Sequence, residues 1–260
     1  MGRLAAVLVV VALLKVLVLW QLKDHVLLQP GATPDSGAYS ELAQPVVSGN
    51  WSLGPGAYFV SPLYIYFQAV VYGAFESFTA VRLVQVLLGT LAVGLMWWTT
   101  REWFGARAAW FAAGVAAMTG LLTFYEISLL QASLDTFLTA ASLAALTAAL
   151  TRSSPLWFGL TGVLFGVHVL NRPNVLVPVA AVVVVLLLVR QWKPAALVVA
   201  GLVLALVPTT VRNISVTGDW SLLPSHGGLN FYIGNAAEAN GLYRAIPGVR
   251  PNILGQAVDA

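Results

Sequence analysis

Long apolar runs separated by short polar connections dominate the chain as far as about residue 210. A single helix of about 20 apolar residues can cross the roughly 30 Å hydrocarbon core of a bilayer. The pattern therefore predicts seven membrane-spanning helices. They cover Leu4–Leu22, Arg82–Thr99, Ala108–Thr123, Leu134–Leu150, Leu156–Leu170, Val175–Val189 and Ala195–Thr210.

One further apolar stretch, Ser61–Phe75, is short and carries Pro62 and Gln68. It is either a short span or a helix that lies in the membrane interface. The distribution of basic residues favours the interfacial alternative, because it places the basic loops on the same, cytoplasmic side as Arg3. Those loops contain Arg101, Arg107, Arg152, Arg190 and Lys193.

This topology predicts two polar outer regions. Residues 1–210 form a transmembrane domain whose first outer loop covers residues 23–81, and residues 211–260 begin an extracytoplasmic segment. We expect that segment to be incomplete, with the chain a fragment of a longer protein. Eight of the ten acidic residues lie in the outer regions or at their boundaries, and the exceptions are Glu102 and Asp135. This asymmetry indicates a functional outer surface.

Composition agrees with an all-α polytopic membrane protein. Hydrophobic residues make up 59% of the chain and charged residues 9%, against roughly 25% charged residues in a typical soluble domain. The net charge of +3 comes from dispersed basic residues, which argues against nucleic acid as a partner. With no cysteine, disulfides and cysteine-based metal sites are excluded.

Candidate chemistry begins with Asp35, in the sequence PDSGAY of the first outer loop. An exposed carboxylate among turn residues can act as a general base or bind a metal. The same position also suits an Asx-turn or the N-cap of a helix over Ser36–Gln44. Spacing alone leaves these interpretations open.

Further ionisable residues fall at span ends. Glu126 lies at the outer boundary and Asp135 just inside the next span, and ionisable groups at membrane depth default to a functional hypothesis. Alternatively, Glu126 simply faces water and Asp135 caps the span. Arg172 suits a phosphate because its guanidinium forms bidentate contacts, and the alternative is an anchor among lipid headgroups. His168 is expected to be a polar residue within the bundle.

In order along the chain, these residues resemble the polytopic glycosyltransferases of the GT-C fold, in the branch of protein O-mannosyltransferases and the aminoarabinose transferase of lipid A. The resemblance is carried by residues on one predicted membrane face and in the turns between spans. It rests on Asp35 with Tyr39 and Ala43, Ser61-Pro62-Leu63-Tyr64, Val81-Arg82, Phe104-Gly105-Ala106-Arg107, Tyr125-Glu126, Arg172-Pro173, Arg212-Asn213, Gly234-Asn235 and Gly241-Leu242-Tyr243.

The resemblance implies transfer of a sugar from a polyprenyl-phosphate donor to a lipid, glycan or protein acceptor at the extracytoplasmic face of a bacterial inner membrane. Asp35 would be the general base or would position the acceptor, and Glu126 would be the second acidic group. Arg172 and Arg212 would bind the donor phosphate. Tyr39, Asn235 and Tyr243 would complete the substrate site.

The sequence leaves open whether a metal cofactor takes part and which class of protein this is. A divalent metal is conceivable, but Gln131-Ala132-Ser133 lacks an acidic residue that some relatives carry there, which leaves few ligands. A transporter or flippase for a lipid-linked or small solute is the alternative function, and it favours repeated halves with polar residues near the midplane. A noncatalytic scaffold would not need charged residues gathered on one outer surface.

Overall fold

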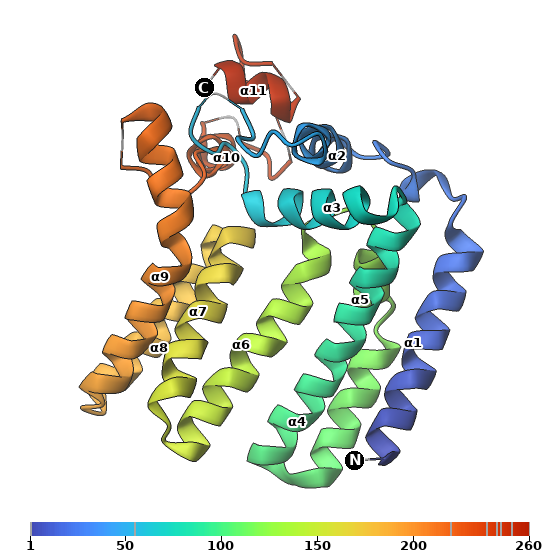
Figure 1. Ribbon diagram of the computed structural model, residues 1–260, viewed down its shortest axis with the longest axis vertical. Helices are drawn as coiled ribbons and strands as arrows, with labels where there is room; N and C mark the ends of the chain where they lie inside the picture. The colour runs from blue at the N-terminus through green and yellow to red at the C-terminus, as the bar shows by residue number, and fades with distance from the viewer. Residues whose placement is uncertain are drawn as a thin grey trace.

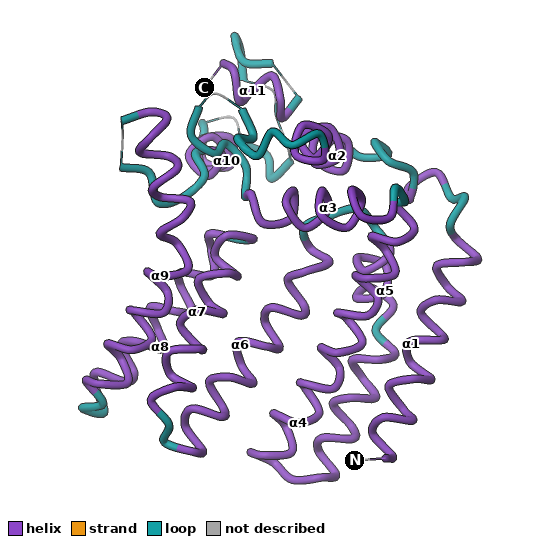
Figure 2. The backbone as a smooth tube through the Cα atoms, in the orientation of Figure 1, coloured by secondary structure: helices purple, strands orange, loops and turns teal. Residues whose placement is uncertain are grey.

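The computed structural model describes residues 2–54, 56–218, 220–237, 239–242, 244, 246–250 and 252–259. Within these residues the regular structure is helical (Figure 2). The helices are α1 (Gly2–Leu22), η1 (Val26–Leu28), α2 (Pro34–Val47), α3 (Pro62–Phe75), α4 (Phe78–Met118), α5 (Gly120–Ile127), α6 (Ala132–Arg152), α7 (Pro155–Asn171), η2 (Pro173–Val175), α8 (Leu176–Leu188), α9 (Trp192–Thr217), α10 (His226–Asn235) and α11 (Ile253–Asp259).

The molecule has a bundle and a cap. Helices α1, α4, α5, α6, α7, α8 and α9 run along the long axis and form the bundle (Figure 1). Helices α2, α3, α10 and α11, with the loops that join them, lie across one end, and we call them the cap. Four helices, α1, α4, α6 and α9, are long and apolar enough to cross a membrane. The predicted fold class, an all-α polytopic membrane protein, is confirmed.

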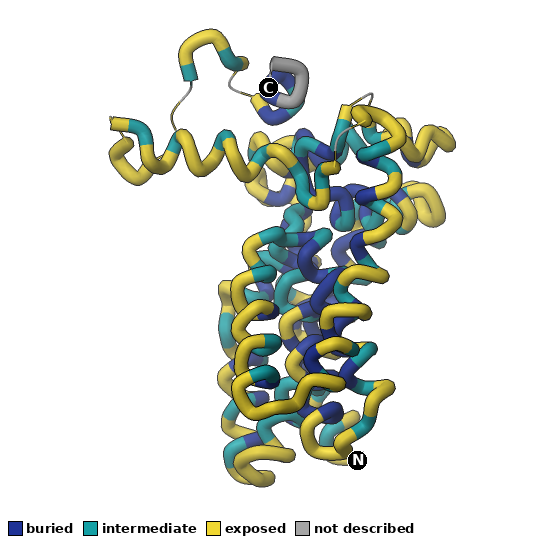
Figure 3. Tube along the Cα trace, turned by 90° about the vertical axis from the view of Figure 1, so that its left-hand side faces the viewer, coloured by how far each residue is buried: buried dark blue, intermediate teal, exposed yellow. Residues whose placement is uncertain are grey.

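The surface of the bundle is apolar where a soluble protein would be polar. Figure 3 shows exposed residues along the length of the bundle. Large examples are Leu13, Phe111 and Leu188, which are 64%, 76% and 77% exposed. Lipid tails satisfy such side chains, whereas water would not. The chain is therefore an integral membrane protein.

Helix α3, which contains the short apolar stretch, is too short to cross a membrane alongside the bundle helices. Its 14 residues rise about 21 Å, which is less than the roughly 30 Å of a bilayer core. Pro62 begins the helix, and Glu76 ends it in the left-handed region at φ 50°. Figure 1 shows α3 lying across the end of the bundle, where the interfacial interpretation places it.

Helix α4 is two helical segments joined at a reversal. Gly105 has φ 82° and ψ 175°, a conformation that favours glycine. The predicted spans Arg82–Thr99 and Ala108–Thr123 lie on either side of this reversal, and the second continues into α5. The seven predicted spans all coincide with helical segments, while their number and the domain boundaries stay predictions.

Helix α9 extends past the predicted end of the last span. The apolar pattern ends near Thr210, but the helix continues to Thr217 and stops at Gly218, whose φ is 75°. The prediction ended too early because hydropathy marks only the part of a helix that lies in lipid. The helix itself ends where its backbone is capped, here by the left-handed Gly218. The polar pair Arg212-Asn213 is therefore on a helix, and this position decides what the pair contacts.

Close helix packing holds the bundle together, and buried polar contacts join the cap to it. In the bundle, a Cβ added to Gly162 on α7 would collide with the carbonyl of Val198 on α9, so the backbones touch, as small residues allow in membrane helices. Between cap and bundle, the Tyr64 hydroxyl donates to Gln85 Oε1 at 2.9 Å. Gln85 Nε2 in turn donates to the carbonyl of Ser128 at 2.8 Å. These contacts fix the cap on the bundle.

Candidate active site

A polar cavity of about 330 Å³ lies where the cap meets the bundle. Segments far apart in the sequence line it: the first turns of α2, the residues before α3, the turn after α7, and α10. It contains three of the residues predicted for the site, namely Asp35, Tyr39 and Arg172. The rest of the lining is Val60, Ser61, Gln131, Pro173, Asn174, Pro224, His226, Gly227, Asn230 and Ile253.

The start of α2 places Asp35 at the cavity. Thr33 caps the helix, because its hydroxyl accepts from Ser36 N at 3.2 Å while Ser36 Oγ accepts from Thr33 N at 3.1 Å. Pro34 and Asp35 follow in the first turn, where the helix dipole favours a negative charge. The cap is therefore Thr33 rather than Asp35. Among the described residues, no hydrogen bond engages the Asp35 carboxylate, which is exposed and available to a ligand.

Tyr39 lies one turn after Asp35 on the same face of α2. Its side chain is buried, and its ring packs edge-on against Tyr64 at 5.4 Å between centroids. Burial raises the pKa of Tyr39 well above its ordinary value, and the nearby Asp35 charge raises it further. The phenol therefore stays protonated and can donate a hydrogen bond into the cavity.

Arg172 reaches the cavity from the end of α7 and is held by an acidic residue of α6. Its Nε forms an ion pair with Asp135 Oδ2. Asp135 Oδ1 also accepts from Asn171 Nδ2 at 2.6 Å and lies 3.5 Å from His168 Nε2. These contacts orient Asp135 and, through it, the guanidinium. The described residues make no hydrogen bond to the two terminal nitrogens of Arg172, which remain free for an anion.

His226 and Asn230 complete the polar lining, and the sequence did not predict either. A short backbone pairing brings them in: Ser225 N donates to Tyr58 O at 3.1 Å, and His226 N donates to Phe59 O at 2.9 Å. Burial lowers the pKa of His226, although the Asp35 charge acts in the opposite direction. The ring is therefore neutral near pH 7, and its Nδ1 lies 3.4 Å from Asn230 Nδ2.

Glu126 lies outside this cavity. Its Oε1 accepts a hydrogen bond from Lys15 Nζ at 2.7 Å, and the two side chains are 1% and 4% exposed. Lys15 belongs to α1, so the pair joins the first span to α5 inside the bundle. Gly89 on α4 leaves room for the carboxylate, because a Cβ there would collide with Glu126. The structure does not bring together the two acidic residues that were predicted to be catalytic.

Arg212 also lies outside the cavity and holds a loop instead. Its guanidinium donates to the carbonyls of Ser52, Gly54 and Gly56, and it lies 4.2 Å from the centroid of the Tyr58 ring. The neighbouring Asn213 Oδ1 accepts from Tyr58 N at 3.1 Å. Because the same loop pairs with residues 225 and 226, Arg212 supports one wall of the cavity indirectly.

Replacing Arg212 with glutamine is expected to lower the free energy of unfolding by roughly 1–3 kcal/mol, since charge-assisted hydrogen bonds to carbonyls would be lost. Protease cleavage within residues 51–60 should become faster, as measured by limited proteolysis of the purified protein. The control is Arg190→Gln, at the opposite end of the bundle. A normal cleavage rate with a weakened affinity for donor would instead make Arg212 a phosphate ligand.

Asn235 does not line the cavity. Asn235 is exposed at the end of α10, and its Nδ2 donates to Phe231 O at 2.8 Å within the same helix. Tyr243 lies outside the described residues. The part of the chain that the structure describes contains no group of three or more His, Cys, Asp or Glu side chains suited to a metal ion.

A family model described as dolichyl-phosphate-mannose-protein mannosyltransferase matches residues 59–212. The match covers more than half of the 260 residues, and the chain belongs to this family. No curated protein and no solved structure matches the chain. The chain is therefore a member of a membrane glycosyltransferase family. This confirms the predicted resemblance to GT-C-like glycosyltransferases as far as the family, but not a particular member. Arg172 lies within the matched segment, whereas Asp35 and Tyr39 precede it.

Proposed function

We propose that the protein transfers a sugar from a polyprenyl-phosphate donor to a hydroxyl of a lipid, glycan or protein acceptor, and that the cavity under the cap is the site of transfer. One observation carries the proposal: a free carboxylate, Asp35, and an oriented guanidinium, Arg172, line the same cavity of about 330 Å³ at the end of a membrane bundle. Family membership supports the class of reaction and of donor.

Asp35 supplies the base. In the proposed step, the acceptor hydroxyl attacks the anomeric carbon of the sugar, and its proton passes to the Asp35 carboxylate. The bond between that carbon and the phosphate oxygen breaks, and polyprenyl phosphate leaves with the bonding electrons. The Tyr39 phenol and the neutral His226 ring offer hydrogen bonds that position the sugar or the acceptor.

Arg172 stabilises the leaving group. Negative charge increases on the phosphate as the bond breaks, and a cation already fixed in place stabilises that charge without reorganising. The ion pair with Asp135 keeps the guanidinium in place, and its terminal nitrogens can form a bidentate contact with two phosphate oxygens. A lipid-linked donor also accounts for a site at the boundary between the bundle and the cap.

We place this reaction on the extracytoplasmic face of a bacterial inner membrane. Arg101, Arg107 and Arg152 lie on the bundle at the end away from the cap, as Figure 1 shows through the positions of the α4 reversal and the end of α6. Basic residues favour the cytoplasmic side, so the cap faces outward. The bacterial assignment rests on the resemblance stated above.

Changing Arg172 to glutamine is expected to weaken donor affinity by about 10- to 100-fold, the equivalent of roughly 1.5–3 kcal/mol for contacts with a charged group. Donor KM, measured with purified protein in lipid vesicles, should rise in that proportion. Arg172→Lys should retain the ion pair with Asp135 and lose the bidentate contact, which gives an intermediate KM.

The matched control for this series is Arg107→Gln, an exposed arginine at the opposite end of the bundle. Its KM should equal that of the wild type. Equal donor KM values for the Arg172→Gln and Arg107→Gln variants, with both proteins folded, would remove Arg172 from the donor site.

A further inference from the structure

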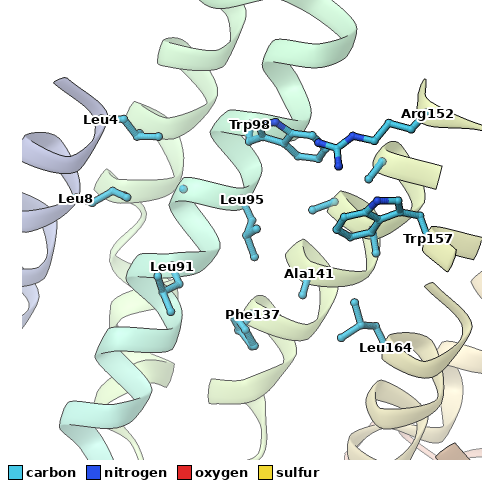
Figure 4. Close-up of a pocket in the computed structure, with 14 residues that line it drawn as sticks. Leu4, Leu8, Leu91, Leu95, Trp98, Phe137, Ala141, Arg152, Trp157 and Leu164 are labelled. Carbon is cyan, nitrogen blue, oxygen red and sulfur yellow. The ribbon is translucent and has the colours of Figure 1, made fainter. Parts of the chain in front are cut away.

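A second cavity, of about 600 Å³, lies inside the bundle at the end away from the cap. Helices α1 and α4 line one side of it and helices α6 and α7 the other (Figure 4). Its lining is apolar apart from Arg152 and the indole N–H groups. It consists of Leu4, Leu8, Leu91, Gly94, Leu95, Trp98, Phe137, Ala141, Ala144, Ala145, Ala148, Arg152, Trp157 and Leu164.

The polar groups of this cavity gather at one end. Arg152 is the last residue of α6, it is exposed, and its guanidinium lies 5.3 Å from the centroid of the Trp157 ring. Figure 4 shows Trp98 and Trp157 beside Arg152, with Phe137 and Leu164 further along the cavity. A cation next to two indoles is the arrangement that membrane proteins place at the level of lipid headgroups.

The cavity is long enough to hold an acyl chain from one leaflet. From Phe137 to Arg152 the α6 axis rises about 22 Å at 1.5 Å per residue, and half of a bilayer core is about 15 Å. An acyl chain can therefore lie along the apolar part while the phosphate to which it belongs reaches Arg152. An apolar lining with a single cation at one end matches the polarity of a lipid molecule.

The phosphate of a donor bound at Arg172 cannot also contact Arg152. Arg172 follows the end of α7 and Trp157 lies in its first turn, so the two are about 22 Å apart along the helix. One phosphate cannot contact both ends of the bundle. A lipid whose phosphate lies on Arg152 therefore belongs to the leaflet on the side away from the cap.

We propose that this cavity binds an anionic phospholipid, with its acyl chain between the α1–α4 and α6–α7 helix pairs and its phosphate on Arg152. A headgroup with a net negative charge is preferred over a zwitterionic one, because Arg152 brings a positive charge that no acidic side chain lining the cavity offsets.

The test uses the full chain, purified and stripped of lipid, with phosphatidylglycerol and phosphatidylcholine as probes. Retained lipid is counted by native mass spectrometry, and the thermal midpoint is followed as lipid is added, since a ligand that binds the folded state raises it. Phosphatidylglycerol should bind with a stoichiometry of one and raise the midpoint more than phosphatidylcholine. Arg152→Gln should weaken phosphatidylglycerol binding by roughly three- to tenfold, as the loss of one charge-assisted contact implies.

The chain offers a close control for Arg152. Arg101 is also exposed at this end of the bundle and lies 5.3 Å from the ring centroid of Trp97, but it does not line the cavity. Arg101→Gln should leave binding unchanged. Equal loss in Arg101→Gln and Arg152→Gln would show only a general attraction of lipid to the basic end of the protein and would overturn the proposal.

The acyl chain has its own pair of variants on α6. Ala141→Phe would fill the cavity and should abolish the stoichiometric lipid, whereas Leu143→Phe faces outward and should not. If Ala141→Phe folds and still retains one phosphatidylglycerol, the cavity is not the site. The contrary result is that polyprenyl phosphate displaces phosphatidylglycerol one for one, equally well in the wild type and in Arg152→Gln. That result would show that the cavity binds a polyprenyl chain, and the proposal would fail.

Discussion

Replacing Asp35 with asparagine is expected to lower the rate of sugar transfer at saturating donor by about two to four orders of magnitude, the usual contribution of a positioned general base. The amide has nearly the shape of the carboxylate but cannot accept the proton of the acceptor hydroxyl. Because Asp35 carries no hydrogen bond to another described residue, the change should leave folding and donor affinity nearly intact. Rates are measured with purified protein and a labelled polyprenyl-phosphate sugar.

The matched control for Asp35 is Glu41→Gln, which removes a carboxylate from an exposed position on the same helix. Its rate should stay within about twofold of the wild type, because surface substitutions away from a site usually change little. If Asp35→Asn and Glu41→Gln transfer sugar equally well, Asp35 is not the base. The reaction class would then survive without the proposed assignment.

Replacing Lys15 with methionine is expected to cost roughly 3–5 kcal/mol of stability, because it leaves the Glu126 carboxylate buried without its partner. Both side chains lie inside the bundle, where the ion pair joins α1 to α5. A large fall in the thermal midpoint in detergent, together with loss of folded protein from membranes, would show the effect.

Two further variants test the pair. Lys15→Met combined with Glu126→Gln removes both charges and should recover most of the lost stability, while Lys23→Met in the exposed pair with Asp24 should cost less than about 1 kcal/mol. The double variant also decides the role of Glu126. If it folds and transfers sugar, Glu126 supports the bundle. If it folds and is inactive, Glu126 belongs to the catalytic machinery, as the resemblance implied.

The sequence predicted the fold well because lipid imposes simple rules on it. Apolar runs have to be helices in a bilayer, since every backbone group must bond within its own segment. The position of α3 followed from its length and from the distribution of basic residues. The extension of α9 to Thr217 was not predictable from hydropathy, because the helix ends at the left-handed Gly218 rather than at the end of the apolar run.

The site was only partly predictable, and the reason lies in sequence separation. Asp35 and Tyr39 are one turn apart on a helix whose start the sequence marks, so one prediction covers both. Glu126 and Lys15 are 111 residues apart, and nothing local shows that they pair. His226 is held at the cavity by its backbone bond to Phe59 and by the packing of the two rings, and Arg212 contacts loop carbonyls 156 to 160 residues away. Such contacts are set by tertiary packing.

The most direct test of the account follows the sugar and the lipid of one donor separately. Sealed vesicles containing purified wild-type protein receive a polyprenyl-phosphate sugar that carries one isotope in the sugar and another in the polyprenyl chain, with a panel of hydroxyl acceptors. We predict that the sugar label passes to an acceptor while sugar-free polyprenyl phosphate, which carries only the chain label, accumulates in equal amount, and that Asp35→Asn stops both. Movement of the intact, doubly labelled donor across the membrane without any transfer would contradict the account and identify a flippase.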